Sequence, residues 1–242
     1  MNKNEIITQN AIKYVKENSK KIIQEIVGNK ASFGKNKLFS VSVFMAGSPG
    51  AGKTEMSKKS IEIIERDPDA KAYEKITRID PDDIREKLPL YNGKNSHLFQ
   101  AACSIAVDRI HDYVLKNNFD FLLDGTFSNY NKARENIYRS VKRKRLVFIY
   151  YVYQDPIVAW GFTKKREQID GRHIPKDAFI DHFFNAKENV SKIKKEFKDL
   201  VKVRVIERNL RTNYSKIGLD VDIDNYIKIG YTKKELNKLL LW

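Results

Sequence analysis

A glycine-rich run near position 50 constrains the fold of this 242-residue chain more than any other feature. The run reads Gly47-Ser48-Pro49-Gly50-Ala51-Gly52-Lys53-Thr54. It matches the pattern Gly-x-x-x-x-Gly-Lys-[Ser/Thr] in full, which indicates a phosphate-binding loop when a strand precedes it and a helix follows it. Residues 38–45 form an apolar, β-branched stretch typical of a buried strand, and residues 53–66 have helical spacing. We therefore expect the loop to bind a nucleoside triphosphate.

Each part of the loop has a chemical reason to be there. The glycines let backbone amides turn inward around the phosphates, and the helix that follows places its positive end beside them. Lys53 would reach the β- and γ-phosphates, and the hydroxyl of Thr54 would ligate Mg²⁺. The expected cofactors are ATP, or GTP in its place, and Mg²⁺.

The rest of the chain alternates between strand and helix patterns. Further strands are expected at residues 75–79, 119–123, 146–153 and 201–206. Helices are expected at residues 6–27, 53–66, 81–88, 96–116, 131–143, 159–169 and 176–198. This alternation predicts an α/β protein, with a P-loop NTPase or kinase-like parallel sheet flanked by helices. We divide it into a helical N-terminal extension (1–37), a kinase core (38–209) with a lid around 160–176, and a tail (210–242) packed on the core, whose structure the pattern leaves open.

Composition indicates the cellular compartment and the kind of partner to expect. One cysteine, Cys103, excludes an internal disulfide and fits a reducing compartment. No apolar run approaches the roughly 18 residues of a membrane helix, and the N-terminus lacks the pattern of a secretory signal. We therefore expect a cytoplasmic protein that does not bind membranes. The net charge of +15 is spread along the chain, with one compact cluster at residues 142–145, so we read it as surface charge and not as a nucleic-acid site. Such a surface would attract an acidic protein partner.

Aspartates follow two of the predicted strands. Asp80 and Asp82 come directly after residues 75–79, and Asp124 ends the strand at 119–123. The carboxyl ends of parallel strands are where ligands bind in such sheets. A carboxylate there can accept the proton of an attacking hydroxyl, and we assign this role to Asp82 while Asp80 caps the next helix. Asp124 suits either an ordering role for Mg²⁺ or a bond to a substrate hydroxyl.

Two arginines bracket a turn between the helices at 159–169 and 176–198. Arg166 and Arg172 flank a segment that ends in Gly171. Phosphoryl transfer concentrates negative charge on the phosphate oxygens, and arginines from a mobile lid can neutralise it. His173 is expected to make only local hydrogen bonds.

These residues, taken in order, resemble the zeta toxin family, the kinase components of bacterial toxin–antitoxin systems, over residues 38–209. The segment Ile79-Asp80-Pro81-Asp82 resembles the family's Ile-Asp-x-Asp segment, whose second aspartate is the catalytic base. Asp124-Gly125-Thr126 resembles the strand end that contacts a sugar-nucleotide substrate, and Asp108 falls where the family has another substrate-binding carboxylate. Arg166 and Arg172 match the two lid arginines.

The resemblance implies the following assignment. The catalytic residues are Lys53, Asp82, Arg166 and Arg172, and the acceptor-site residues are Asp80, Asp108, Asp124 and Thr126. The family's acceptor is UDP-N-acetylglucosamine, phosphorylated on the 3′-hydroxyl, and an antitoxin blocks the nucleotide site. Two departures concern the acceptor: Asp108 and Asp124 stand where we expect the longer Glu, and Ser128 stands where family members often have a basic residue.

Two other functions fit the same loop. The positive charge allows a kinase of another nucleotide or of nucleic-acid ends, although no aromatic-basic module accompanies it. The N-terminal helical segment is also compatible with a non-catalytic protein in which nucleotide binding controls the binding of a partner.

Overall fold

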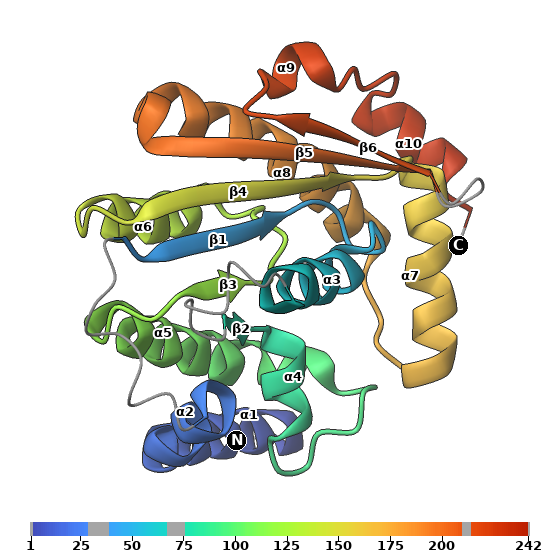
Figure 1. Cartoon of the computed structure of the whole chain (residues 1–242). Helices are drawn as coiled ribbons and strands as arrows, with labels where there is room; N and C mark the ends of the chain where they lie inside the picture. Colours follow the sequence, from blue (N-terminus) through green and yellow to red (C-terminus); the bar gives the residue numbers. More distant parts are fainter. Residues whose placement is uncertain (1, 29–38, 67–75, 210–213, 242) are drawn as a thin grey trace.

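The computed structural model describes residues 2–28, 39–66, 76–209 and 214–241, and they build one mixed sheet covered by helices (Figure 1). The strands are β1 (Val41–Ala46), β2 (Thr77–Ile79), β3 (Phe121–Leu123), β4 (Leu146–Tyr153), β5 (Val201–Asn209) and β6 (Tyr214–Leu219). They lie in the order β2-β3-β1-β4-β5-β6. Neighbouring strands from β2 to β5 pair in parallel, and β6 pairs with β5 in the antiparallel sense. The predicted α/β fold with a parallel sheet is confirmed, and the antiparallel edge strand is an addition to it.

Helices connect the strands. The α-helices are α1 (Lys3–Glu17), α2 (Ser19–Val27), α3 (Lys53–Arg66), α4 (Pro81–Glu86), α5 (Gln100–Lys116), α6 (Tyr130–Val141), α7 (Pro156–Asp170), α8 (Lys176–Phe197), α9 (Ile223–Tyr226) and α10 (Lys233–Leu239). Short 3-10 turns at Ser96–Phe99 and Lys198–Leu200 lead into α5 and β5. The start of the expected strand at 38–45 and of that at 75–79 lies outside the described residues.

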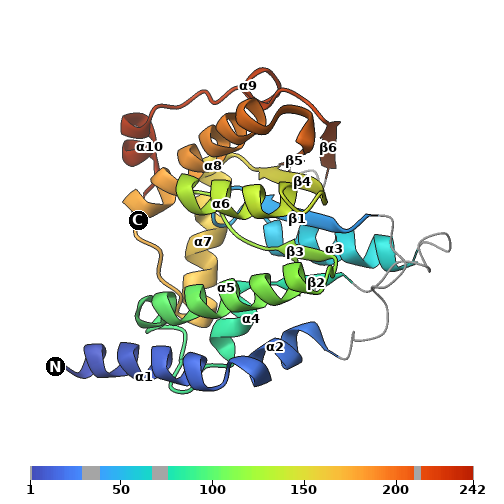
Figure 2. The ribbon, with the colours of Figure 1, turned by 90° about the vertical axis from the view of Figure 1, so that its left-hand side faces the viewer.

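Strand β1 shows why the core has two layers. Val43 and Met45 belong to a cluster with partly buried side chains of α3, whereas Phe44 and Ala46 belong to the cluster that contains the buried faces of α5, α6 and α8. Successive strand residues point to opposite faces, so a strand buried on both sides is apolar throughout. Figure 2 accordingly shows α3 on one face of the sheet and α5, α6 and α8 on the other.

The N-terminal segment forms two helices where one continuous helix was predicted. The break falls at Asn18, whose side-chain amide donates to the Tyr14 carbonyl at 2.9 Å, while the Ser19 hydroxyl donates to the Val15 carbonyl at 2.6 Å. Side chains that bond to nearby backbone compete with the helical ladder, which explains the interruption. Both helices pack on α5 at the β2 end of the sheet, and Val15 and Ile22 are buried in the main core (Figures 1 and 2).

The C-terminal segment adds elements that the sequence pattern did not predict. Strand β6 extends the sheet beyond β5. Helix α10 buries Leu236 and Leu240 against Trp160 of α7 and against α8. This contact holds the N-terminal part of α7 in place, and the C-terminal end of α7 extends past the carboxyl ends of the strands (Figure 1). In the described part of the chain, no helix combines the length and apolar character needed to cross a membrane.

Candidate functional site

The glycine-rich loop joins β1 to α3 and is wedged between other elements. A Cβ on Gly50, where φ is 73°, would lie 2.1 Å from the Ala159 carbonyl oxygen of α7. A Cβ on Gly52, where φ is 86°, would lie 2.0 Å from a guanidinium nitrogen of Arg208 on β5. Positive φ and this close approach both require glycine. The loop is therefore held in one shape by α7 and β5.

Lys53 begins α3 and folds back over the loop. Its Nζ donates to the Ser48 carbonyl at 2.7 Å. Desolvation lowers the pKa of Lys53 to about 8, against the opposing effect of Asp124, Asp82 and Asp80. A buried ammonium with incomplete compensation is prepared for an anionic ligand, because added negative charge would restore its usual pKa.

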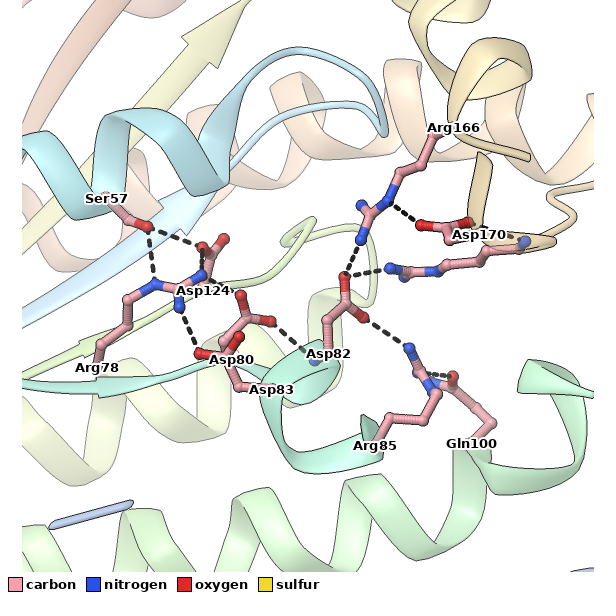
Figure 3. Close-up of polar contacts among 11 residues, drawn as sticks. Ser57, Arg78, Asp80, Asp82, Asp83, Arg85, Gln100, Asp124, Arg166 and Asp170 are labelled. Carbon is pink, nitrogen blue, oxygen red and sulfur yellow. Dashed lines mark hydrogen bonds and ion pairs between the residues drawn. The ribbon is translucent and has the colours of Figure 1, made fainter. Parts of the chain in front are cut away.

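Arg78 on β2 gathers the carboxylates at the ends of β2 and β3, and sequence reasoning missed it. Its guanidinium bonds Asp80, Asp83 at 2.5 Å and Asp124 at 3.1 Å (Figure 3). Its Nε also donates to the Ser57 hydroxyl of α3 at 3.0 Å. The signal that could have found it is its place two residues before Asp80 in a parallel strand, since residues at i and i+2 share one face of a strand.

Asp82 in the first turn of α4 lies among three other arginines. Its Oδ1 accepts from Arg85 at 2.6 Å, and its Oδ2 accepts from Arg166 at 3.2 Å and from Arg172. The structure thus brings both predicted lid arginines onto the predicted base (Figure 3). Burial opposes the effect, but Arg172, Arg85 and Arg166 together hold the pKa of Asp82 below its usual value.

Asp80 behaves differently although it is only two residues away. It caps α4, accepting from the Asp82 amide at 2.8 Å. Burial, together with the nearby Asp124 charge, raises the pKa of Asp80 to about 6 in spite of Arg78. Two neighbouring carboxylates with pKa values moved in opposite directions often mark a functional site.

The end of β3 lies close to the phosphate loop. Asp124 accepts from the Ser57 hydroxyl at 2.9 Å, and the Gly47 amide donates to the Thr126 carbonyl at 3.2 Å. The Thr126 and Ser128 hydroxyls lie 2.8 Å apart. Asp124 and Thr126 therefore border the loop.

Asp108 is engaged elsewhere. It is on α5 and forms a 2.7 Å ion pair with Lys132 of α6. Within the described ranges Asp108 bonds neither Asp82 nor Asp124. Its predicted role in the acceptor site stays a prediction.

The segment predicted as a lid, around residues 160–176, contacts the loop that precedes α5. Gly171 ends α7 in the left-handed conformation, with φ 76°. Gly93, also at positive φ, approaches so closely that a Cβ there would lie 1.9 Å from the Asp170 carbonyl oxygen. His173 bonds Glu167 at 2.6 Å, which is the local contact expected of it. The docked lid explains how Arg166 and Arg172 reach Asp82 across the site.

The basic cluster at residues 142–145 is only partly a surface feature. Arg145 is buried and donates to the carbonyls of Val41 and Phe119 at 2.7 and 2.6 Å. Burial lowers the pKa of Arg145 to about 10. One of the four cations therefore serves the core, which weakens the cluster as a nucleic-acid patch.

Comparison with known proteins decides the family. A family model described as Zeta toxin matches residues 11–217. The chain belongs to the zeta toxin family. No curated protein matches the sequence significantly.

Several solved structures share the fold of this chain. A chain from the structural characterization of the PezAT chromosomal toxin–antitoxin system of the human pathogen Streptococcus pneumoniae superimposes with a TM-score of 0.65 at 13% identity, covering 94% of this chain and 92% of that one. A chain of an AvrRxo1-ORF1:-ORF2 complex with ATP gives 0.66 at 14% identity, covering 88% and 70%. A related complex with sulphate ions gives 0.59 at 12% identity, covering 91% and 70%. At these identities the likeness shows the shared kinase-like fold.

Proposed function

We propose that this zeta toxin family member is an ATP-dependent small-molecule kinase that phosphorylates a hydroxyl of a sugar nucleotide, such as the 3′-hydroxyl of UDP-N-acetylglucosamine. The observation that carries the proposal is the meeting of Asp82 with Arg166 and Arg172. Lys53 lies close enough to interact electrostatically with Asp82 and Arg172. A base, an anion-binding loop and two lid arginines in one place are the parts that phosphoryl transfer needs.

Within this proposal each residue of the site has one role. The loop from Gly47 to Thr54 binds the triphosphate, and Lys53 binds its terminal phosphates. Asp82 accepts the proton of the acceptor hydroxyl as that oxygen attacks phosphorus. Arg166 and Arg172 stabilise the charge on the transferring group. Asp80, Asp108, Asp124 and Thr126 face or orient the acceptor.

The donor set near the loop fits Mg²⁺, which would neutralise charge on the phosphates when bound. Thr54 supplies a hydroxyl, and Asp124 supplies a carboxylate within hydrogen-bond reach of Ser57, three residues after Thr54 on the same helix. Among the described residues, no group of three or more His, Cys, Asp or Glu side chains forms a cation cage. This suits Mg²⁺, which is usually held by one or two protein oxygens together with substrate phosphates and water.

By the same proposal the protein is the toxin of a toxin–antitoxin system. The neighbours described as a toxin–antitoxin system and as a two-component ORF1:ORF2 complex support a protein partner of this kind. The net charge of +15 favours an acidic antitoxin. The single cysteine fits a reducing compartment, which supports a cytoplasmic location as part of this proposal.

The test is a transfer assay with an inactive variant. The protein is incubated with ATP, Mg²⁺ and a panel of sugar nucleotides and dinucleotides, and mass spectrometry identifies the species that gains a phosphate. Asp82→Asn is expected to lower transfer by at least about 10³-fold while ATP binding stays near wild type, since the base contributes to chemistry and not to the loop. Asp112→Asn, which alters an exposed carboxylate on α5, is the matched control.

Three results would contradict the proposal or part of it. Full transfer by Asp82→Asn would remove the assignment of the base. Phosphate gain by oligonucleotide ends and by no sugar nucleotide would favour the nucleic-acid reading. ATP binding without turnover of any acceptor would favour a nucleotide switch.

A further inference from the structure

Arg85 differs from the two other arginines on Asp82 in where it is held. Arg85 is 4% exposed, and it belongs to the same short helix as Asp82, three residues on. Its second guanidinium nitrogen donates to the Gln100 side-chain oxygen at 3.2 Å, at the first residue of α5. It is therefore fixed to two elements of the core and not to the lid.

The lid arginines are held less firmly. The Arg166 side chain is 50% exposed and that of Arg172 is 21% exposed, against 5% for Arg85, and Arg172 lies in the loop between α7 and α8. Both bond the Oδ2 atom of Asp82, whereas Arg85 bonds Oδ1. The two oxygens of one carboxylate thus have separate partners, one set from the core and one from the lid.

This separation has a consequence for the reaction. A bound γ-phosphate carries more negative charge than a carboxylate and would draw Arg166 and Arg172 toward itself. Oδ2 would then lose its partners and become free to face the acceptor. Arg85 cannot follow, because it is buried and tied to Gln100.

We propose that Arg85 is a positioning residue that keeps hold of Oδ1 of Asp82 throughout the reaction, so that Oδ2 is the atom that takes the proton. This inference rests on the proposed function. In the step, the acceptor O–H bond breaks and its proton passes to Oδ2. The acceptor oxygen bonds the γ-phosphorus as the bond from that phosphorus to the β,γ-bridging oxygen breaks, and ADP leaves.

Two readouts separate this role from a merely structural one. Arg85→Gln is expected to lower kcat by about 10²-fold with the KM for ATP within about threefold of wild type. It is also expected to move the acid limb of the pH profile of kcat up by about one pH unit, because loss of a neighbouring cation raises the pKa of a carboxylate. Arg85→Lys keeps the charge, so kcat should fall by about tenfold while the acid limb stays in place.

Gln100→Ala is a variant that weakens the position of Arg85 without changing the charge of Arg85 or Asp82. Gln100 is exposed and alanine suits a helix, so the fold should be retained. Without its anchor, Arg85 should position Asp82 less well, and kcat should fall about threefold to tenfold. Arg139→Gln, which removes an arginine from an ion pair with Asp112 near the other end of α5, is the control and should leave kcat and the pH profile unchanged.

The titration of the Asp82 carboxyl carbon, followed by NMR in the ligand-free protein and assigned with Asp82→Asn, needs no substrate. A higher midpoint in Arg85→Gln than in wild type is the expected result. An unchanged midpoint together with wild-type kcat in Arg85→Gln, or in Arg85→Lys and Gln100→Ala if the glutamine variant does not fold, would overturn the role of Arg85. A wild-type protein without transfer activity would instead overturn the proposed function, and the NMR midpoint would still decide whether Arg85 acts on Asp82.

Discussion

Affinity for ATP should fall steeply as pH rises above neutrality, and Lys53 is the cause. In the ligand-free protein the pKa of Lys53 is lowered to about 8 by desolvation. The terminal phosphates of a bound nucleotide would lie against its ammonium group, and their charge would return the pKa to at least its usual value of about 10.4. ATP therefore binds the protonated form more tightly, and binding takes up a proton wherever the free protein has lost it.

The size of the effect follows from the protonated fraction. With a pKa of about 8, roughly three quarters of free Lys53 is charged at about pH 7.5 and roughly one tenth at about pH 9. The apparent Kd for ATP should increase by about eightfold over this interval, or about 1.2 kcal/mol. The affinity is fully present below the free pKa and is lost as pH rises above it. The phosphates of ATP are already ionised over this range, so the change belongs to the protein.

The assay is isothermal titration calorimetry at several pH values in buffers with different ionisation enthalpies. Near pH 8 the dependence on buffer should reveal uptake of about half a proton for each ATP bound. Lys53→Arg is the matched control, because arginine stays charged throughout. Whatever its absolute affinity, Lys53→Arg should show neither proton uptake nor the loss of affinity at high pH. A wild-type profile as flat as that of Lys53→Arg would refute the reasoning.

Three further outcomes are expected. Arg166→Ala and Arg172→Ala should each lower kcat by about 10²-fold while ATP stays bound, since these side chains stabilise charge that develops during transfer; wild-type kcat in steady-state assays would contradict this. Asp80→Asn should raise the free energy of unfolding by about 1–3 kcal/mol at neutral pH, measured by urea unfolding. The folded pKa of Asp80 is raised to about 6, so its contribution is favourable below about pH 4 and is lost as pH rises through about 6, and the gain from Asn should vanish in acid. Gly93→Val should lower kcat/KM with ATP affinity retained, because a side chain there would collide with the Asp170 carbonyl and hold the lid away; a normal kcat/KM would show that docking does not matter.

Local patterns were enough to predict the framework of the site. The run from Gly47 to Thr54 needs only its own residues and its two flanking elements to form a phosphate loop. Asp82 and Asp124 were found because chain position after a strand maps directly onto the carboxyl edge of a parallel sheet. These features depend on short stretches of sequence, which explains why they could be read without a structure.

The contacts that complete the site depend on packing between distant segments. A local rule would place Arg78 and Arg85 on the surface. Only the packing of β2, β3, α3, α4 and α5 shows that Arg85 is buried and that Arg78 is largely covered. Strand β6 was not predicted because its residues have no clear strand pattern of their own, and pairing with β5 determines its conformation. The N-terminal helices show the opposite limit, since side-chain bonds from Asn18 and Ser19 to the preceding turn interrupt a helix that the pattern predicts as continuous.

The arginines of the site differ in burial, and burial determines which of them can leave its carboxylate partner when a phosphate binds. Arg85 bonds Asp82 from a position 5% exposed at the side chain, where loss of that carboxylate would strand a buried charge. Arg78, 12% exposed, is shared among three carboxylates. Arg166, at 50% exposure, makes the kind of pair worth at most about 1 kcal/mol. Arg172 is 21% exposed at the side chain and bonds the same oxygen as Arg166, so nucleotide binding has to replace two contacts to Oδ2 of Asp82 while the contact of Arg85 to Oδ1 remains. Asp82 therefore binds Arg166 and Arg172 through an oxygen that a bound phosphate would replace as their anionic partner, whereas Arg85 keeps its own oxygen.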